Sequence, residues 1–154
     1  IGRLYEDIPT TYKIFAKCTT NIGFIAKPMY NYVLHNSSIS FKGSPLKSYH
    51  IYLGFKERFE YVKMHFTRCY EHSLFLACNH GLTTYSGYYL NHYNELMPSL
   101  KDIDSFLIEH KQEIFKSPML SCKRKILFKF YFINKQLFKR VVLVNQKINK
   151  LLKQ

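Results

Sequence analysis

The stretch GFKERFEYVKMHF, residues 54–66, sets the pattern that most of the chain follows. Its apolar residues Phe55, Phe59, Val62 and Phe66 recur every three or four positions, as they do on one face of an amphipathic helix. From this stretch onward the apolar residues keep helical spacing, and no further strand pattern appears. The sequence therefore predicts that the chain after residue 46 is helical.

The rest of this part is expected to form three further helical regions. Pro98 and Pro118 separate these regions, because a proline within a helical pattern usually ends the helix at the preceding residue. Gly81 and Gly87 lie inside the first region and weaken the expectation that it is one continuous helix. The expected regions are residues 68–89, 100–115 and 122–152, the last as one helix or two.

The chain before residue 46 has a different pattern. A helix is predicted first, with Pro9 tolerated in its first turn and Asp7 as its cap or as a first-turn anion. Two short strands and a polar loop rich in Ser and Gly are predicted next. The expected order is a helix at 8–18 (IPTTYKIFAKC), strands at 21–26 (NIGFIA) and 29–35 (MYNYVLH), and a loop at 35–45.

The expected fold class is therefore mainly α with a small β element (α+β). Two strands with unpaired outer edges are marginal by themselves. We expect residues 1–45 to belong to a sheet whose other strands lie outside this chain, and residues 46–154 to form a helical region. Because the first residue is Ile1, the chain is expected to be a trimmed, processed or partial form of a longer protein.

Positive charge is concentrated at the C-terminal end. The net charge is +13, yet residues 1–113 hold twelve basic and ten acidic residues, whereas residues 114–154 hold eleven basic residues and no acidic one. From about residue 120 onward, Lys and Arg alternate with bulky apolar residues, a pattern typical of helices that bind anionic membrane surfaces. The expected membrane contacts are Lys123, Arg124, Lys125, Lys129, Lys139 and Arg140.

Two other interpretations of this tail stay open. It can be the end of a helical bundle with a solvated basic face, or it can pair two copies of the chain through its apolar stripe. No apolar run approaches the roughly 18 residues that a membrane-spanning helix needs.

Several residues of metal-binding type are expected to be structural. Four widely spaced cysteines predict reduced thiols in a cytosolic protein. The Cys and His residues between positions 69 and 80 lack the tight paired spacing of zinc ligands, so core packing is expected for them. Asp102-Ile103-Asp104 is expected to supply solvated charges at a helix start. The residues in question are Cys18, Cys69, His72, Cys78, His80, Asp102, Asp104 and Cys122.

Two segments together resemble the closing part of the catalytic domain of family 2 glycosyltransferases of the GT-A type. They are GRLYEDIPTTYKIF, residues 2–15, and IAKPMYNYVLHNSSIS, residues 25–40. That family often has a Glu-Asp pair before a helix, then a Pro-x-Tyr-x-Tyr strand and a loop ending in Ser-Ile. The later helices resemble, more loosely, the C-terminal helices of bacterial members that build surface polysaccharides. The matching residues are Gly2, Tyr5, Glu6, Asp7, Thr10, Thr11, Pro28, Tyr30, Tyr32, Ser38 and Ile39.

The resemblance implies an inverting transfer of sugar from a nucleotide-diphosphate sugar to a saccharide or lipid-linked acceptor. Asp7 would be the base that accepts the acceptor's proton, with helix capping as its alternative role. Glu6 would orient the acceptor or hold the loop. His35 would contact the metal or the diphosphate, or would be a plain surface histidine. Arg3 would meet phosphate, or would be a lone surface arginine.

The resemblance also implies that a part of the enzyme is absent from this chain. The family's nucleotide-binding half, with an Asp-x-Asp motif for Mg or Mn, precedes the matching region. The chain is therefore expected to be inactive alone, and the intact enzyme to lie in the cytoplasm at the inner face of the membrane.

A second class of function remains open, namely a non-enzymatic basic module that binds nucleic acid or an anionic membrane. Thirteen Tyr and thirteen Phe would permit stacking on bases. However, the charge is confined to one tail and no nucleic-acid motif is present, so no nucleic-acid partner is expected.

Overall fold

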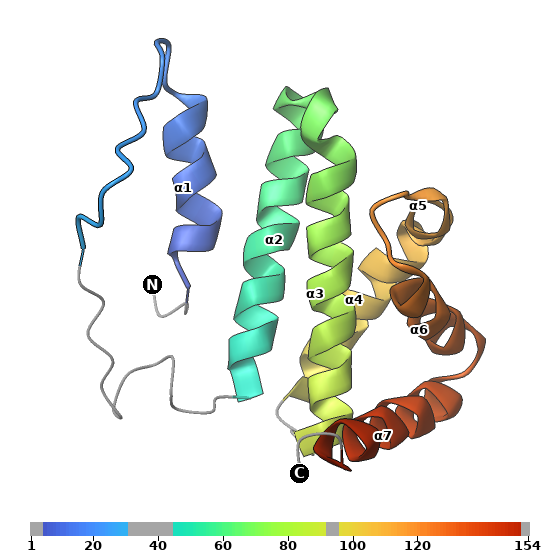
Figure 1. Cartoon of the computed structure of the whole chain (residues 1–154). Helices are drawn as coiled ribbons and strands as arrows, with labels where there is room; N and C mark the ends of the chain where they lie inside the picture. Colours follow the sequence, from blue (N-terminus) through green and yellow to red (C-terminus); the bar gives the residue numbers. More distant parts are fainter. Residues whose placement is uncertain (1–4, 31–44, 92–95, 152–154) are drawn as a thin grey trace.

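The computed structural model describes residues 5–30, 45–91 and 96–151, and their regular structure is entirely helical (Figure 1). No strand occurs within these three ranges. The helices are α1 (Asp7–Ala16), α2 (Pro45–His65), the short 3-10 turn η1 (Thr67–Cys69), α3 (Tyr70–Asn91), α4 (Met97–Glu109), α5 (Lys111–Lys116), α6 (Cys122–Ile133) and α7 (Lys135–Leu151).

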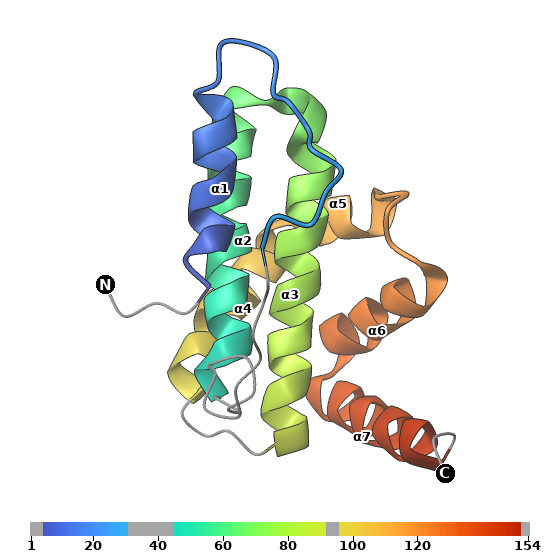
Figure 2. The ribbon, with the colours of Figure 1, turned by 60° about the vertical axis from the view of Figure 1, so that its left-hand side comes forward.

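Helices α2 and α3 form an antiparallel hairpin at the centre of the molecule, joined by η1 (Figures 1 and 2). The stretch that predicted α2 supplies its buried face, because Phe59 is completely buried and Val62 is nearly so. Leu82 and Ala77 of α3 are completely buried in the same core. The apolar spacing in the sequence thus matches the packing of this hairpin except at Phe66, which lies just beyond the end of α2 and is 42% exposed.

Helix α1 packs along α2, so that α2 lies between α1 and α3 (Figure 1). The two helices approach closely at Gly54, where an added Cβ would lie 2.9 Å from Ile8 Cγ2 and 3.1 Å from Ile8 Cβ. Further along, Lys13 Nζ lies 2.5 Å from Glu57 Oε1. Glycine is therefore needed in α2 for α1 to pack at this distance.

The remaining helices cover the other side of the hairpin. Helix α4 contributes Phe106, whose ring packs edge-on against Tyr52 and Phe59 of α2 with centroids 6.0 and 5.7 Å away. Helices α6 and α7 follow and turn sharply at Asn134, which interrupts the expected 122–152 region. The Asn134 side-chain oxygen accepts hydrogen bonds from the backbone N–H groups of Gln136 (2.7 Å) and Leu137 (3.1 Å), and so caps α7.

The expected α+β class is wrong for the described chain. Residues 21–26 are irregular, as are 29–30 of the second expected strand, and the rest of that strand lies outside the described residues. A strand needs a neighbour to take its backbone hydrogen bonds, and none of the described segments supplies one. The apolar side chains of Ile22, Phe24 and Ile25 are instead 59%, 91% and 65% exposed.

Two expectations about helix boundaries also need correction. Helix α3 runs without a break through Gly81 and Gly87, because tertiary packing outweighs the low helix propensity of glycine. The single helix expected at 100–115 is two helices that meet at His110, and Pro98 lies in the first turn of α4 instead of ahead of it. In the part of the chain that is described, no helix is long and apolar enough to cross a membrane.

Candidate functional site

The acidic pair lies at the N-terminal end of α1. Glu6 occupies the N-cap position but makes no side-chain capping bond, and Asp7 is the first residue of the helix. Both residues are exposed. Thr10 and Thr11 donate hydrogen bonds to the backbone carbonyls of Glu6 (2.6 Å) and Asp7 (2.8 Å), not to the carboxylates. Asp7 is thus a first-turn anion, as one alternative predicted, and not the cap.

Asp7 lines an open groove of about 330 Å³ between α1 and α2. Helix α1 supplies Thr11 and Tyr12 to the groove, and α2 supplies Arg58 from the opposite side. The Nε atom of Arg58 is buried and has no hydrogen-bond partner among the described residues. Burial raises the pKa of the Tyr12 phenol, so this hydroxyl stays protonated at neutral pH. The groove therefore combines a carboxylate, a guanidinium and hydroxyl groups.

The other two residues predicted to contact substrate, His35 and Arg3, lie outside the described residues. Of the four candidates from the N-terminal region, the structure therefore places only Glu6 and Asp7.

The predicted membrane contacts do not share one surface. Lys123 and Arg140 border an apolar groove of about 450 Å³ between α6 and α7, which is lined by Ile126, Val141, Val144 and Ile148. Lys129 is exposed on α6 and Lys125 is half-buried. Lys139 lies with its Nζ 5.7 Å from the ring centroid of Tyr89. Arg124 faces α3 instead, and its Nη2 donates to Thr83 Oγ1 at 3.4 Å.

A polar cluster around Asp104 joins four helices. The Asp104 carboxylate of α4 accepts hydrogen bonds from the hydroxyls of Tyr85 in α3 (3.0 Å) and Tyr131 in α6, and from Lys135 Nζ in α7 (2.5 Å). Burial, followed by the neighbouring carboxylate, raises the pKa of both tyrosines. The expectation that Asp104 is a solvated helix-start charge is therefore wrong, since partners from distant helices surround it. Asp102 likewise pairs with Lys56 Nζ of α2 at 2.5 Å.

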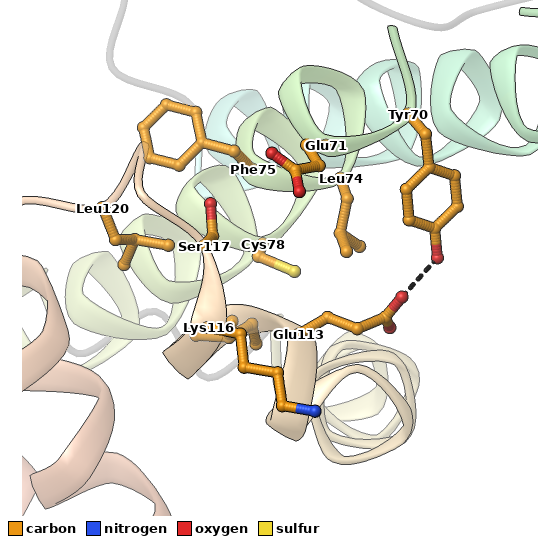
Figure 3. A pocket seen from close by; sticks show the side chains of 10 residues that line it. Tyr70, Glu71, Leu74, Phe75, Cys78, Glu113, Lys116, Ser117 and Leu120 are labelled. Carbon is orange, nitrogen blue, oxygen red and sulfur yellow. Dashed lines mark hydrogen bonds between the residues drawn. The ribbon is translucent and has the colours of Figure 1, made fainter. Parts of the chain in front are cut away.

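A second cluster lies where α5 meets α3, beside a cavity of about 190 Å³ (Figure 3). Glu113 accepts a hydrogen bond from the Tyr70 hydroxyl at 2.5 Å, and its other oxygen lies 2.6 Å from Nδ1 of the buried His110. Burial tends to raise the pKa of Glu113, but these hydrogen bonds outweigh it and hold the pKa below its ordinary value.

Cys78 lies in the wall of this cavity, and Figure 3 shows its sulfur between the apolar side chains and Glu113. Burial raises the pKa of the Cys78 thiol, so it stays protonated and is a poor nucleophile. The expectation of core packing is confirmed for Cys78, which is completely buried, whereas Cys69 is exposed. Within the described ranges, no group of three His, Cys, Asp or Glu residues is arranged to hold a metal ion.

Comparison with known proteins adds no relative: no protein-family model, no curated protein and no solved structure matches the chain.

Proposed function

We propose that this chain forms the acceptor-side, C-terminal part of an inverting glycosyltransferase, in which Asp7 is the general base. The observation that carries the proposal is the position of the Asp7 carboxylate. It is exposed in the first turn of α1, and it lines a groove that also holds Arg58 and hydroxyl groups. The resemblance of residues 2–40 to family 2 glycosyltransferases supplies the reaction class.

In this reaction the acceptor hydroxyl attacks the anomeric carbon of a nucleotide-diphosphate sugar. Asp7 takes the proton from the hydroxyl as the new bond forms, and the nucleoside diphosphate leaves from the opposite face of the sugar. Arg58 and the Thr11 hydroxyl would orient the acceptor by hydrogen bonds to its other hydroxyl groups. A divalent metal, Mg or Mn, would stabilise the leaving diphosphate and would be held by the donor-binding half of the intact enzyme.

The exposed apolar segment after α1 supports the idea of a partner half. Ile22, Phe24, Ile25 and Met29 are all more than half exposed within a short stretch. Several large apolar side chains exposed within one short segment favour an interaction surface. We propose that the donor-binding half of the enzyme packs against residues 22–29.

The test uses the intact enzyme and a panel of nucleotide-diphosphate sugars. Asp7→Asn should lower the transfer rate by about 10²- to 10⁴-fold, which is the range that general-base catalysis contributes, while affinity for the donor changes little. Glu60→Gln removes an equally exposed carboxylate from α2 and should leave transfer unchanged. Near-normal turnover by Asp7→Asn would rule out its role as base.

We further propose that the enzyme attaches to the cytoplasmic face of the membrane through α6 and α7. The apolar groove between these helices is flanked by Lys123 and Arg140, so apolar side chains and cations face the same region. Anionic headgroups complement this charge, whereas a second copy of the chain would bring the same cations against it. A lipid surface is therefore a better partner for this groove than another copy.

A further inference from the structure

A second groove, of about 400 Å³, lies between α3, α6 and α7, and six of its nine lining residues carry hydrogen-bonding side chains. On α7, Asn145 and Asn149 are one turn apart, so they project from the same face of the helix. The polar lining residues are Thr83, Ser86, Arg124, Asn145, Gln146 and Asn149.

Arg124 is the only cation in the lining of this groove, and its hydrogen bond within the described chain is the one to Thr83 Oγ1. Burial lowers the pKa of Arg124, but an arginine still carries its charge at neutral pH. No carboxylate in the described ranges pairs with it. The acidic residue of α3, Glu71, precedes Thr83 by twelve positions, or about 18 Å along a helix. The sequence after residue 113 contains no acidic residue.

Because no carboxylate pairs with the half-buried Arg124 guanidinium, an anionic ligand can neutralise its charge. The planar fork of arginine matches two oxygens of a phosphate group. The hydroxyls and amides around it both donate and accept hydrogen bonds, as the hydroxyl groups of a sugar or of glycerol require. The volume of the groove lies within the range of small-molecule sites.

We propose that the groove between α3, α6 and α7 binds a phosphate ester that carries free hydroxyl groups, with Arg124 on the phosphate and Asn145, Gln146 and Asn149 on the hydroxyls. This chemistry has two sources, a free sugar or glycerol phosphate and the headgroup of a hydroxylated phospholipid. Leu127 and Asn145 line both this groove and the apolar groove between α6 and α7, so the phosphate site borders the surface proposed to face lipid. The site does not depend on Asp7 or on sugar transfer.

The experiment is a titration of the ¹⁵N-labelled 154-residue chain with glycerol 3-phosphate, glucose 1-phosphate, inorganic phosphate and glycerol, followed by NMR. The side-chain amide signals of Asn145, Gln146 and Asn149 should shift in a saturable way with the phosphate esters, and less with phosphate or glycerol alone. Arg124→Gln should weaken binding about tenfold or more, because it removes charge-assisted hydrogen bonds. Lys101→Gln, which removes an exposed cation of α4 that lines neither groove, is the control and should bind normally.

Vesicles with and without phosphatidylglycerol separate the two sources. Binding of the free esters that depends on Arg124 identifies a soluble ligand, and Arg124-dependent binding of the vesicles alone identifies a lipid headgroup. Equal losses for Arg124→Gln and Lys101→Gln would show general charge attraction and overturn the proposal. The proposal would also be overturned if neither the free esters nor the vesicles showed binding that depends on Arg124. This outcome counts only if the circular dichroism spectrum of Arg124→Gln matches that of the unmodified chain.

Discussion

The ammonium group of Lys135 lies over the ring of Tyr131, with its Nζ 3.1 Å from the ring centroid. The same Nζ lies 2.5 Å from Oδ1 of Asp104, which also accepts the Tyr131 hydroxyl. One carboxylate on α4 therefore holds the junction between α6 and α7, and Tyr85 connects it to α3. Since the contacts of Asp104 span 19 to 31 residues of sequence, the cluster fixes how the C-terminal helices pack on the hairpin.

Replacing Asp104 with alanine should lower the free energy of unfolding by about 2–3 kcal/mol, because three donors lose their shared acceptor in a partly buried site. Urea unfolding followed by circular dichroism measures this change. Ser105→Ala on the same helix is the control: its exposed hydroxyl bonds only to the Lys101 carbonyl, and the change should be within about 0.5 kcal/mol. Equal stabilities for the two variants would show that the Asp104 cluster does not stabilise the fold.

The contact between α1 and α2 predicts opposite effects at two helical glycines. In Gly87→Ala the added Cβ would lie 3.9 Å from Ser48 Oγ, which is an ordinary contact distance. This variant should stabilise the chain by about 0.5–1 kcal/mol, because alanine has a higher helix propensity than glycine. Gly54→Ala gains the same propensity, but its Cβ would collide with Ile8. It should therefore destabilise the chain by about 1 kcal/mol and displace α1.

Hydrogen exchange separates these two effects. The backbone amides of α1 should lose protection in Gly54→Ala and keep it in Gly87→Ala. If both alanines stabilise the chain equally and α1 stays protected, the close approach at Gly54 does not constrain the packing of α1.

The helices could be predicted from the sequence because their signals are local. The spacing of Phe59 and Val62 predicts the buried face of α2, and Pro118 marks the break between α5 and α6. The break at His110 could not be predicted in the same way, since apolar spacing continues from α4 into α5. The strand expected at residues 21–26 was wrong because strand formation depends on a partner, which these residues do not find in the described chain.

The polar clusters could not be predicted from the sequence for a different reason. Asp104 reaches Tyr85, Tyr131 and Lys135 from sequence separations of 19 to 31 residues, and no short motif contains all four. The sequence of Asp102-Ile103-Asp104 predicts solvated charges, because the actual partners of these carboxylates are set by helix packing. Likewise, Arg124 could be predicted as a basic surface residue, but its orientation toward Thr83 is visible only in the folded chain.

Glu113 predicts a loss of stability in acid. Its pKa is lowered in the folded chain, so its contribution is present above the unfolded carboxyl pKa of about 4.3 and is lost as the pH falls through the folded value. The stability of the unmodified chain should therefore fall toward that of Glu113→Gln as the pH drops from about 5 to about 3. Urea unfolding at a series of pH values measures this convergence.

Tyr70→Phe is the companion variant for this prediction. It removes one of the hydrogen bonds that lower the Glu113 pKa, which brings the folded pKa closer to the unfolded value. The loss of stability in acid should therefore be smaller than in the unmodified chain and complete at a higher pH. Parallel pH profiles for the unmodified chain and Glu113→Gln would contradict the proposed role of this carboxylate.

The proposed attachment of α6 and α7 to lipid predicts that charge and apolar contact act together. The double variant Lys123→Gln/Arg140→Gln should bind vesicles with phosphatidylglycerol about 30-fold more weakly, at about 1 kcal/mol for each lost cation. Val144→Glu should also weaken binding, because it places a carboxylate in the apolar groove. Lys101→Gln, an exposed cation on α4, is the control. Co-sedimentation measures each affinity, and a loss as large for Lys101→Gln as for the groove variants would mean that net charge alone drives attachment.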